Sequence, residues 1–407
     1  MAENRPLRIL MMIHRQADKS AYCQYVHEQA KALRERGHDV TVIACVGVTP
    51  MMRRLRPEQA EIAKNTPGAA VVDGVDVHYP CCLTLGNAGE RLFGGRLMAR
   101  AALPVARRLH AERPFDLVHA HMLPRDGHAG LLVGRALGVP VALTVHGTDV
   151  FHYFKPGEKP WRRNIRIARR VDALMAVSSL LLSRVQPYRG KKRLSLVVPN
   201  GVDLSLVPQR TKNTPRAVIS VGTLKARKCM DRTLEAFARL AGEYPDATLT
   251  IVGMGEMEAQ LRARIEELRL GSRVTLTGWL SHAQVMERMA QSDLFVLPSW
   301  GEGYGIVYIE AMAAGCIAVG AKGEGIEDTI TDGENGFLVP AGDVDETERV
   351  MRAVFAEPDR YAVMRERGRR DAVGLTWARN AETVEGVYRQ ILDEAHRRRP
   401  KKEKKER

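Results

Sequence analysis

Short apolar runs alternate with longer helical patterns along most of this 407-residue chain, and they form two separate series. The alternation is typical of strands joined by helical crossovers, so it predicts an α/β fold with parallel sheets. The strands of the first series are expected at residues 9–13, 40–43, 117–119, 141–145, 174–177 and 196–198. The strands of the second series are expected at residues 217–221, 249–252, 274–276, 294–297, 317–319 and 336–339.

A turn signal separates the two series. Pro199-Asn200-Gly201 is a strong turn sequence, and a polar stretch over residues 209–215 follows it. We therefore predict a Rossmann-like N-terminal domain over residues 1–205 and a second Rossmann-like domain over residues 206–375. The last helical pattern, at about residues 376–396, is expected to return to the first domain. Two doubly wound domains that face one another would have their active site in the cleft, because ligands bind at the carboxyl ends of parallel strands.

The net charge of +14 is unevenly distributed. Residues 397–407 contain eight Lys or Arg and two Glu, so this basic tail contributes +6, and we expect it to be disordered. A second basic segment spans residues 91–108, where five arginines surround apolar side chains and Pro104 is expected to interrupt a helix. Such a segment either lies on an anionic membrane or forms a solvated helix face. Nucleic acid is disfavoured as a partner, because aromatic residues make up only 5% of the chain.

Other bulk features indicate the compartment. No segment approaches the roughly 18 consecutive apolar residues that a membrane span needs. The first residues lead into a short apolar run that suits a β-strand better than a secretory signal. The six cysteines are scattered without a CxxC pair, which argues against zinc and against a disulfide framework. We expect a cytoplasmic protein, with a peripheral position at the inner face of the plasma membrane as an option.

Residues 298–315 carry the strongest functional signal. A glycine-rich turn follows an apolar strand and leads into a helix, with Glu302 in the turn and Glu310 one turn inside the helix. Backbone N–H groups at Gly303 and Gly305 can hold a phosphate at the helix start. The two carboxylates can accept hydrogen bonds from vicinal hydroxyls. A sugar nucleotide offers both phosphate and hydroxyls, so the pattern predicts a site for one.

A basic loop over residues 222–228 follows the first strand of the second series. Its cations include Arg227 and Lys228, which can neutralise a diphosphate leaving group. Positive charge that is preorganised where negative charge develops is usually the largest catalytic term.

Histidines follow two strands of the first series. The run His146-Gly147-Thr148-Asp149 stands at a strand end, where His146 can hydrogen-bond a sugar or a phosphate oxygen. His119 and His121 share one strand face, and His121 is nearer the carboxyl end of that strand, so it is expected to reach the cleft.

Two other chemistries are disfavoured. His119-Ala120-His121 with Asp126 and His128 does not match the His-x-His-x-Asp-His run of metallo-β-lactamase-like hydrolases, so no metal is expected. Gly253-Met254-Gly255 is only a fragment of a dinucleotide fingerprint, because Glu258 stands at its last glycine position. A nicotinamide enzyme is therefore disfavoured.

Together these residues resemble the family 4 retaining glycosyltransferases, which have the GT-B architecture of two facing Rossmann-like domains. The resemblance covers nearly the whole chain. It depends on Gly37-His38-Asp39-Val40, His146-Gly147-Thr148-Asp149, Pro199-Asn200-Gly201-Val202-Asp203, Gly253-Met254-Gly255 and residues 222–228, 302–313 and 332–339. Within the family, residues 26–29 and Asp126-Gly127 look most similar to bacterial enzymes of cell-surface polysaccharide synthesis, of the teichuronic-acid type.

The resemblance implies a role for each candidate residue. The catalytic residues would be His146, Glu302 and Lys228, with Glu302 on the hydroxyls of the donor sugar and His146 in contact with that sugar. Glu310 would bind the ribose hydroxyls, and Lys228 would bind the diphosphate with backbone amides. The implied donor-binding residues are Gly222, Arg227, Lys228, Gly253, Gly303, Tyr304, Gly305, Ile306 and Glu310. The acceptor would lie on the N-terminal domain, near His121 and Asp149.

The implied reaction moves a glycosyl unit from a UDP- or GDP-sugar to a glycan or a lipid-linked glycan. It proceeds with retention of anomeric configuration and without a metal or another cofactor, and a β-phosphate oxygen serves as the base. A close pair of carboxylates of the kind found in retaining glycosidases is not required.

Three positions depart from the family pattern. The loop over residues 14–22 has no glycine, where the family often has a pair. Thr223 stands where an arginine commonly follows the glycine, and Lys225 or Arg227 is expected to substitute for it. Cys229 replaces a frequent glycine after the lysine.

Two other functions are compatible with the same architecture. A sugar-nucleotide 2-epimerase would need an acid/base pair near the sugar ring. A non-catalytic glycosyltransferase-like subunit would bind a partner enzyme or a membrane, and the retained glutamate pair argues against that reading.

Overall fold

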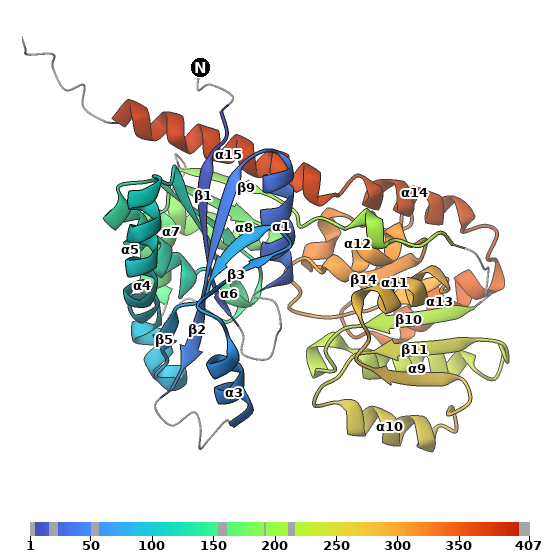
Figure 1. Cartoon of the computed structure of the whole chain (residues 1–407). Coiled ribbons are helices and arrows are strands. Elements are labelled where there is room, and N and C mark those ends of the chain that lie inside the picture. Colours follow the sequence, from blue (N-terminus) through green and yellow to red (C-terminus); the bar gives the residue numbers. More distant parts are fainter. Residues whose placement is uncertain are drawn as a thin grey trace, which may run out of the picture. The chain divides into compact units, whose positions relative to one another are not determined.

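The computed structural model describes residues 5–15, 23–49, 57–153, 161–190, 193–210 and 216–398. The chain divides into two compact units, each with its own sheet (Figure 1). Unit 1 comprises Met1–Val198 and Trp377–Arg407, and unit 2 comprises Pro199–Thr376. The expected boundaries after residues 205 and 375 lie near these positions. The basic tail, except for its first two residues, falls outside the described residues.

In the described part of unit 1, nine strands form one sheet in the order β3-β4-β2-β1-β6-β7-β8-β9, with β5 beside β2. Neighbouring strands are parallel, except for the antiparallel pair β3 and β4. The strands are β1 Arg8–Arg15, β2 Asp39–Val48, β3 Ala69–Val72, β4 Val75–His78, β5 Cys81–Leu83, β6 Leu117–His121, β7 Val141–Val145, β8 Ala173–Ala176 and β9 Leu194–Val197. The helices are α1 Gln24–Glu35, α3 Pro57–Asn65, α4 Gly86–Glu112, α5 Asp126–Leu137, α6 Thr148–Phe151, α7 Trp161–Arg170, α8 Ser179–Arg189 and α15 Trp377–Arg398.

In unit 2, six strands form a parallel sheet in the order β12-β11-β10-β13-β14-β15 over the described residues. The strands are β10 Ala217–Val221, β11 Thr248–Val252, β12 Val274–Gly278, β13 Leu294–Val296, β14 Ile317–Ala321 and β15 Phe337–Val339. The helices are α9 Met230–Leu240, α10 Glu258–Glu267, α11 His282–Ala290, α12 Ile306–Ala313, α13 Val344–Ala356 and α14 Ala362–Val373. Three short 3₁₀ helices are η1 Leu204–Leu206, η2 Ala226–Lys228 and η3 Gly325–Asp328.

Every strand that the apolar runs predicted is present, and the predicted α/β class with parallel sheets is confirmed. The short strands β3, β4 and β5 were not predicted. Asp73-Gly74 was the available signal for the hairpin of β3 and β4, because Asp-Gly is a preferred two-residue hairpin turn. Both residues have positive φ, 47° for Asp73 and 78° for Gly74, as such a turn requires.

The expected interruption at Pro104 is wrong, because α4 runs without a break from Gly86 to Glu112. Pro104 itself is exposed, whereas Met98, Ala102 and Ala106 are fully buried along the opposite side of the helix. Burial of that face stabilises the helix against the hydrogen bond that proline cannot donate. None of the described helices is both long and apolar enough to cross a membrane.

The helix α15 packs on unit 1, beside α1 (Figure 1). Gln29 of α1 donates to Asn380 at 2.8 Å, and Arg36 donates to Glu385 at 2.8 Å. Burial alone would raise the pKa of Glu385, but hydrogen bonds from Arg389, Arg36 and His38 lower it to about 2. These contacts attach the end of the described chain to its first domain.

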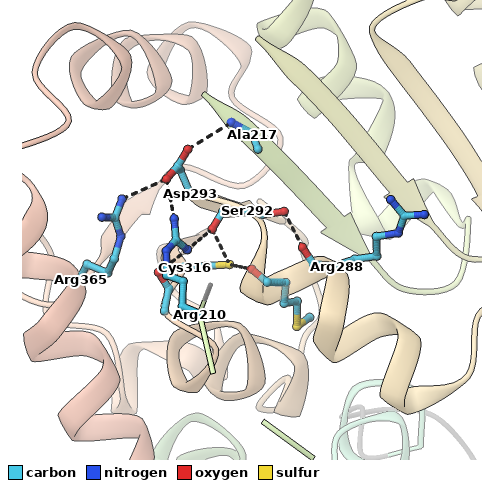
Figure 2. A network of polar contacts seen from close by, with 9 residues as sticks. Arg210, Ala217, Arg288, Ser292, Asp293, Cys316 and Arg365 are labelled. Atoms are coloured by element: carbon cyan, nitrogen blue, oxygen red, sulfur yellow. Dashed lines mark hydrogen bonds and ion pairs between the residues drawn. The ribbon is translucent and has the colours of Figure 1, made fainter. Parts of the chain in front are cut away.

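The amino ends of three strands of unit 2 are joined by a buried network (Figure 2). The Asp293 carboxylate, just before β13, accepts hydrogen bonds from Arg210 at 2.7 Å and from Arg365 at 3.3 Å. Its second oxygen accepts from the amide of Ala217 at 3.3 Å. Arg210 also donates to the carbonyl of Ser292 at 2.6 Å. This network holds the strands together at their amino ends, opposite to the carboxyl ends where ligands bind in such sheets.

We predict that Asp293→Ala lowers the free energy of unfolding of unit 2 by about 3 kcal/mol, because two partly buried guanidinium groups lose their carboxylate. Urea unfolding followed by circular dichroism measures the change. The control is Asp345→Ala, since Asp345 pairs with Arg239 but its side chain is 84% exposed. Exposed ion pairs contribute little. Equal effects of the two substitutions would contradict the role given to the network.

Candidate functional site

The strand order of unit 2 reverses between β10 and β13. In open α/β sheets, ligands bind at the carboxyl ends of the strands at such a switch point. The loop over residues 222–228 follows β10, and the glycine-rich turn follows β13. The two loops touch, because the amide of Trp300 donates to the carbonyl of Arg227 at 2.9 Å. Chain folding therefore brings together the two motifs that the sequence singled out.

Lys228 and Glu302 form the centre of this site. The ammonium group of Lys228 donates to the Glu302 carboxylate, and Arg227 lies 3.7 Å from the same oxygen. Lys228 is buried and the Glu302 side chain is only 14% exposed. Two cations share the Glu302 carboxylate here, so both keep N–H donors that an anionic group can use.

The glycine-rich turn is held by a carboxylate that the sequence analysis missed. Glu324 accepts hydrogen bonds from the amides of Gly301 at 2.9 Å and Glu302 at 2.6 Å. The amide of Gly325 then donates to the carbonyl of Glu302 at 3.1 Å. Glu324 is 22 residues from Glu302 in sequence, so no local pattern connects the two. It fixes the backbone from which the Glu302 side chain extends.

The helix α12 begins immediately after Gly305, which has a φ of 81°. A Cβ at Gly305 would lie 2.6 Å from the ring of Tyr308, so only glycine fits this position. No side chain caps the helix at Gly305, and the first amides of a helix have no acceptor in a preceding turn. The Tyr308 amide donates to the Gly305 carbonyl at 3.0 Å, so the amides of Ile306 and Val307 are the ones that this applies to. This helix start can therefore receive an anion next to the Lys228 cluster.

Tyr304 differs from its neighbours in this turn. Its side chain is buried, and burial raises the pKa of its hydroxyl to about 12. The hydroxyl lies 3.4 Å from Thr329. Only the backbone of Tyr304 is therefore positioned for a ligand in this structure. Gly303 belongs to the same turn and, as a glycine, offers only backbone atoms to a ligand.

Glu310 lies within α12 and has a partner that was not predicted. His282, the first residue of α11, places its Nε2 atom 2.8 Å from a Glu310 oxygen. The start of α11 is fixed by a capping box in which Ser281 and Gln284 exchange hydrogen bonds. That capping box is the sequence signal for the helix start that presents His282. The pairing orients the Glu310 carboxylate.

Two candidate glycines are required for close approach of backbone segments. A Cβ at Gly253 would overlap the carbonyl oxygen of Gly222, and Gly253 has a φ of 141°. Gly222 has a φ of 156°, and its amide donates to Val252 at 3.0 Å. These glycines therefore set the spacing of the loops after β10 and β11.

Cys229 occupies the position where the family often has glycine. Its φ is 53°, in the left-handed region, and it precedes the first residue of α9. Burial raises the pKa of its thiol to about 11, so the side chain stays neutral and unreactive at physiological pH. The structure thus accommodates this departure with a backbone conformation that glycine would adopt more readily.

In unit 1, the buried His119 and His121 and the half-buried His146 form a cluster. His121 Nδ1 lies 3.2 Å from His146 Nε2, and His119 bonds Tyr388 at 2.6 Å and Thr144 at 2.8 Å. Burial lowers the pKa of His121 to about 3, and burial with the neighbouring His121 lowers the pKa of His146. All three rings are therefore neutral at physiological pH. They can exchange hydrogen bonds but do not supply charge.

Asp149 is fully buried below the His146 loop. Its carboxylate accepts from the amides of His146 at 3.0 Å, Gly147 at 2.8 Å and Leu123 at 3.0 Å. Burial raises its pKa, and these hydrogen bonds oppose that shift. In this structure Asp149 positions the loops after β6 and β7, and a direct acceptor contact stays a prediction.

The strand order of unit 1 also reverses, between β1 and β6. His14 near the end of β1 places Nδ1 2.9 Å from the carboxylate of Asp126, the buried first residue of α5. The sequence analysis did not select His14 as a site residue. Most of the glycine-free loop that follows it lies outside the described residues. No group of three or more metal-ligating side chains occurs in the part of the chain that the structure describes.

Comparisons with known proteins indicate a glycosyltransferase. The family model for glycosyltransferase family 4 matches residues 24–206, and that for glycosyl transferases group 1 matches residues 205–371. The chain is 27% identical over 389 residues to a glycogen synthase of Mycobacterium tuberculosis, covering 92% of this chain and 91% of that protein.

Two solved structures have a similar fold. Sucrose-phosphate synthase of Thermosynechococcus elongatus matches with a TM-score of 0.75 and 19% identity, over 95% of this chain and all of that one (100%). Anabaena HepE in complex with UDP and glucose matches with a TM-score of 0.70 and 18% identity, over 94% of this chain and 100% of that one. These structures show the two-domain GT-B fold.

The neutral histidines predict a pH dependence of stability. Burial lowers the pKa of His119, His121 and His146 in the folded protein, whereas an unfolded histidine titrates near its ordinary value of 6.5. Below pH 6.5 the unfolded chain binds more protons at these sites than the folded protein does, and for His121 this holds down to about pH 3. Their contribution to stability is therefore complete above pH 6.5 and is lost as the pH falls below it.

We expect His121→Asn to reduce the slope of the unfolding free energy against pH by up to one proton near pH 5, as measured by urea unfolding at several pH values. The exposed His152→Asn is the control and should leave the slope unchanged. An unaltered slope in His121→Asn would show that this ring is already charged in the folded protein.

Proposed function

This chain belongs to glycosyltransferase family 4, and from that premise we propose that it is a retaining enzyme using a UDP- or GDP-sugar donor. The acceptor that we propose is a glycan or a lipid-linked glycan of cell-surface polysaccharide synthesis. The carrying observation is the cluster of Lys228, Arg227 and Glu302 beside the open start of α12, at the switch point of unit 2.

The diphosphate of the donor suits this cluster. As the bond from the sugar to the β-phosphate breaks, negative charge develops on the leaving phosphate. Lys228, Arg227 and the first amides of α12 are already in place, and preorganised charge of this kind stabilises the transition state without reorganisation. Glu302 then accepts hydrogen bonds from sugar hydroxyls, and His146 is proposed as a neutral partner for the sugar.

We propose retention without an enzyme carboxylate as nucleophile. Glu302 is held by Lys228, which favours its use as a hydroxyl acceptor. In the proposed step, the acceptor oxygen forms a bond to the anomeric carbon on the face that the nucleoside diphosphate leaves. The acceptor proton passes to an oxygen of the departing phosphate, so that the nucleoside diphosphate is released and no metal is needed.

The nucleotide part is proposed to lie over the ends of β11 and β12. Met254 follows β11 and is 58% exposed, and Trp279 follows β12 and is 73% exposed. An exposed aromatic ring can stack on a base. The HepE structure that resembles this fold contains UDP and glucose, which makes UDP-sugars the first donors to test. Glu310, oriented by His282, is the proposed ribose partner.

The first test is calorimetric titration of the purified protein with UDP, GDP and ADP. We expect one nucleotide to bind selectively, and Glu310→Ala to weaken that binding at least about tenfold, because a hydrogen bond to a charged group contributes about 1.5–3 kcal/mol. Glu334→Ala in the same unit is the matched control, since Glu334 pairs with Arg367 at the surface. Equal binding of all three nucleotides, unaffected by Glu310→Ala, would overturn the proposed ribose site.

The second test is sugar transfer by Glu302→Gln, which keeps the shape of the side chain but removes its charge. We expect transfer to fall by at least about 100-fold, since charge-assisted hydrogen bonds are roughly twice as strong as neutral ones and Lys228 loses its partner. Release of free nucleotide with an added acceptor is measured against the control Glu346→Gln, whose side chain is 42% exposed and pairs with Arg349. Normal turnover of Glu302→Gln would remove Glu302 from the mechanism.

A further inference from the structure

We propose that α4 and α7 of unit 1 form a docking surface for an anionic lipid bilayer. The docking surface consists of Leu92, Phe93, Arg96 and Arg100 on α4, and of Arg163, Arg166 and Arg170 on α7. The inference extends the proposed function, because a lipid-linked acceptor is presented at a membrane. It concerns binding to lipid, which is measured without any donor or acceptor.

Three helices bring these side chains together. Gly95 of α4 lies against His128 of α5, where a Cβ would be only 2.6 Å from the histidine Cβ. Gly127 of α5 lies in turn against Ile167 of α7. Arg163 links α7 directly to α4, because its Nη1 donates to the carbonyl of Leu92 at 2.8 Å. Figure 1 shows α4, α5 and α7 beside one another in unit 1.

The arginines share helix faces. Arg163, Arg166 and Arg170 have the spacing i, i+3 and i+7, which aligns them along α7 on the side of Arg163. Phe93, Arg96 and Arg100 have the same spacing along α4. The sequence of α7 and residues 92–111 contain no Asp or Glu. The surface is therefore positive without compensating carboxylates on these segments.

The electrostatic effect is visible at His128, which lies between the two helices. Burial lowers the pKa of its ring, and the charges of Arg163, Arg96 and Arg170 lower it further. Arginines from both helices thus act on one point. Arg96, Arg100 and Arg166 are exposed, and none of them has a hydrogen bond or an ion pair with a described residue. Their charge is available to an anionic surface.

Exposed apolar side chains distinguish a bilayer from a soluble polyanion. Leu92 is 58% exposed and Phe93 is 46% exposed, both in the same part of α4 as the arginines. A solvated helix face has no need of either side chain, and a polyanion offers nothing apolar to contact. A bilayer interface accepts both, because cations bind its headgroups while aromatic and aliphatic side chains enter the acyl boundary.

The test is sedimentation of the full-length chain with vesicles of phosphatidylcholine and anionic phosphatidylglycerol, on which each basic residue near the surface gains about 1 kcal/mol. We expect R96E/R100E/R166E to weaken binding on the order of 100-fold, since each lost arginine is a factor of about five. The charge-matched control is R288E/R369E/R370E, which changes three exposed arginines of unit 2 and should retain most of the binding. Circular dichroism verifies that both variants are folded.

A second variant, Phe93→Ser, isolates the apolar part of the proposal. It should weaken vesicle binding several-fold and leave binding to inorganic polyphosphate unchanged. Unchanged vesicle binding by R96E/R100E/R166E would overturn the proposal and assign any membrane binding to the basic tail. Loss of polyphosphate and vesicle binding by the arginine variant, with Phe93→Ser behaving like the native chain, would instead indicate a soluble polyanion. Neither result depends on sugar transfer, which is assayed separately on a soluble acceptor.

Discussion

The reversal of strand order between β10 and β13 is the constraint on which the rest of the site depends. Adjacent strands whose crossovers diverge leave their carboxyl ends uncovered, so polar loops can meet there without being buried by a helix. Lys228 and Glu302, 74 residues apart, become partners at this point. Unit 1 repeats the arrangement between β1 and β6, where His14 meets Asp126. In both units, the topology selects which residues can act together.

The amino ends and the carboxyl ends of the unit 2 strands each carry a carboxylate that is paired with two cations. At the amino ends, the Asp293 carboxylate accepts hydrogen bonds from Arg210, Arg365 and a backbone amide, and this network stabilises the sheet. At the carboxyl ends, Lys228 and Arg227 share the Glu302 carboxylate, and no side chain caps the start of α12. Lys228, Arg227 and the start of α12 together suit an anionic group, and we propose the donor diphosphate as that group.

The sequence predicted the elements of the fold better than the partners within the site. Each apolar run became a strand, because a strand buried on both faces needs a continuous apolar segment. Glu302, Glu310 and Lys228 were identifiable because they stand at fixed distances from glycine turns. Glu324 and His282 were not, since their contacts join residues 22 and 28 positions apart and only tertiary folding creates them. The expected break at Pro104 was wrong because tertiary packing of α4 outweighs the local helix-breaking preference of proline.

The two units differ in the charge of their candidate site residues. The three clustered histidines of unit 1 are neutral at physiological pH, because burial lowers the pKa of His119, His121 and His146. Asp149 is occupied by backbone amides. Unit 2 holds the cations that suit phosphate. A neutral histidine cluster in one unit and cations in the other match the reaction that we propose, in which a charged diphosphate leaves a neutral sugar.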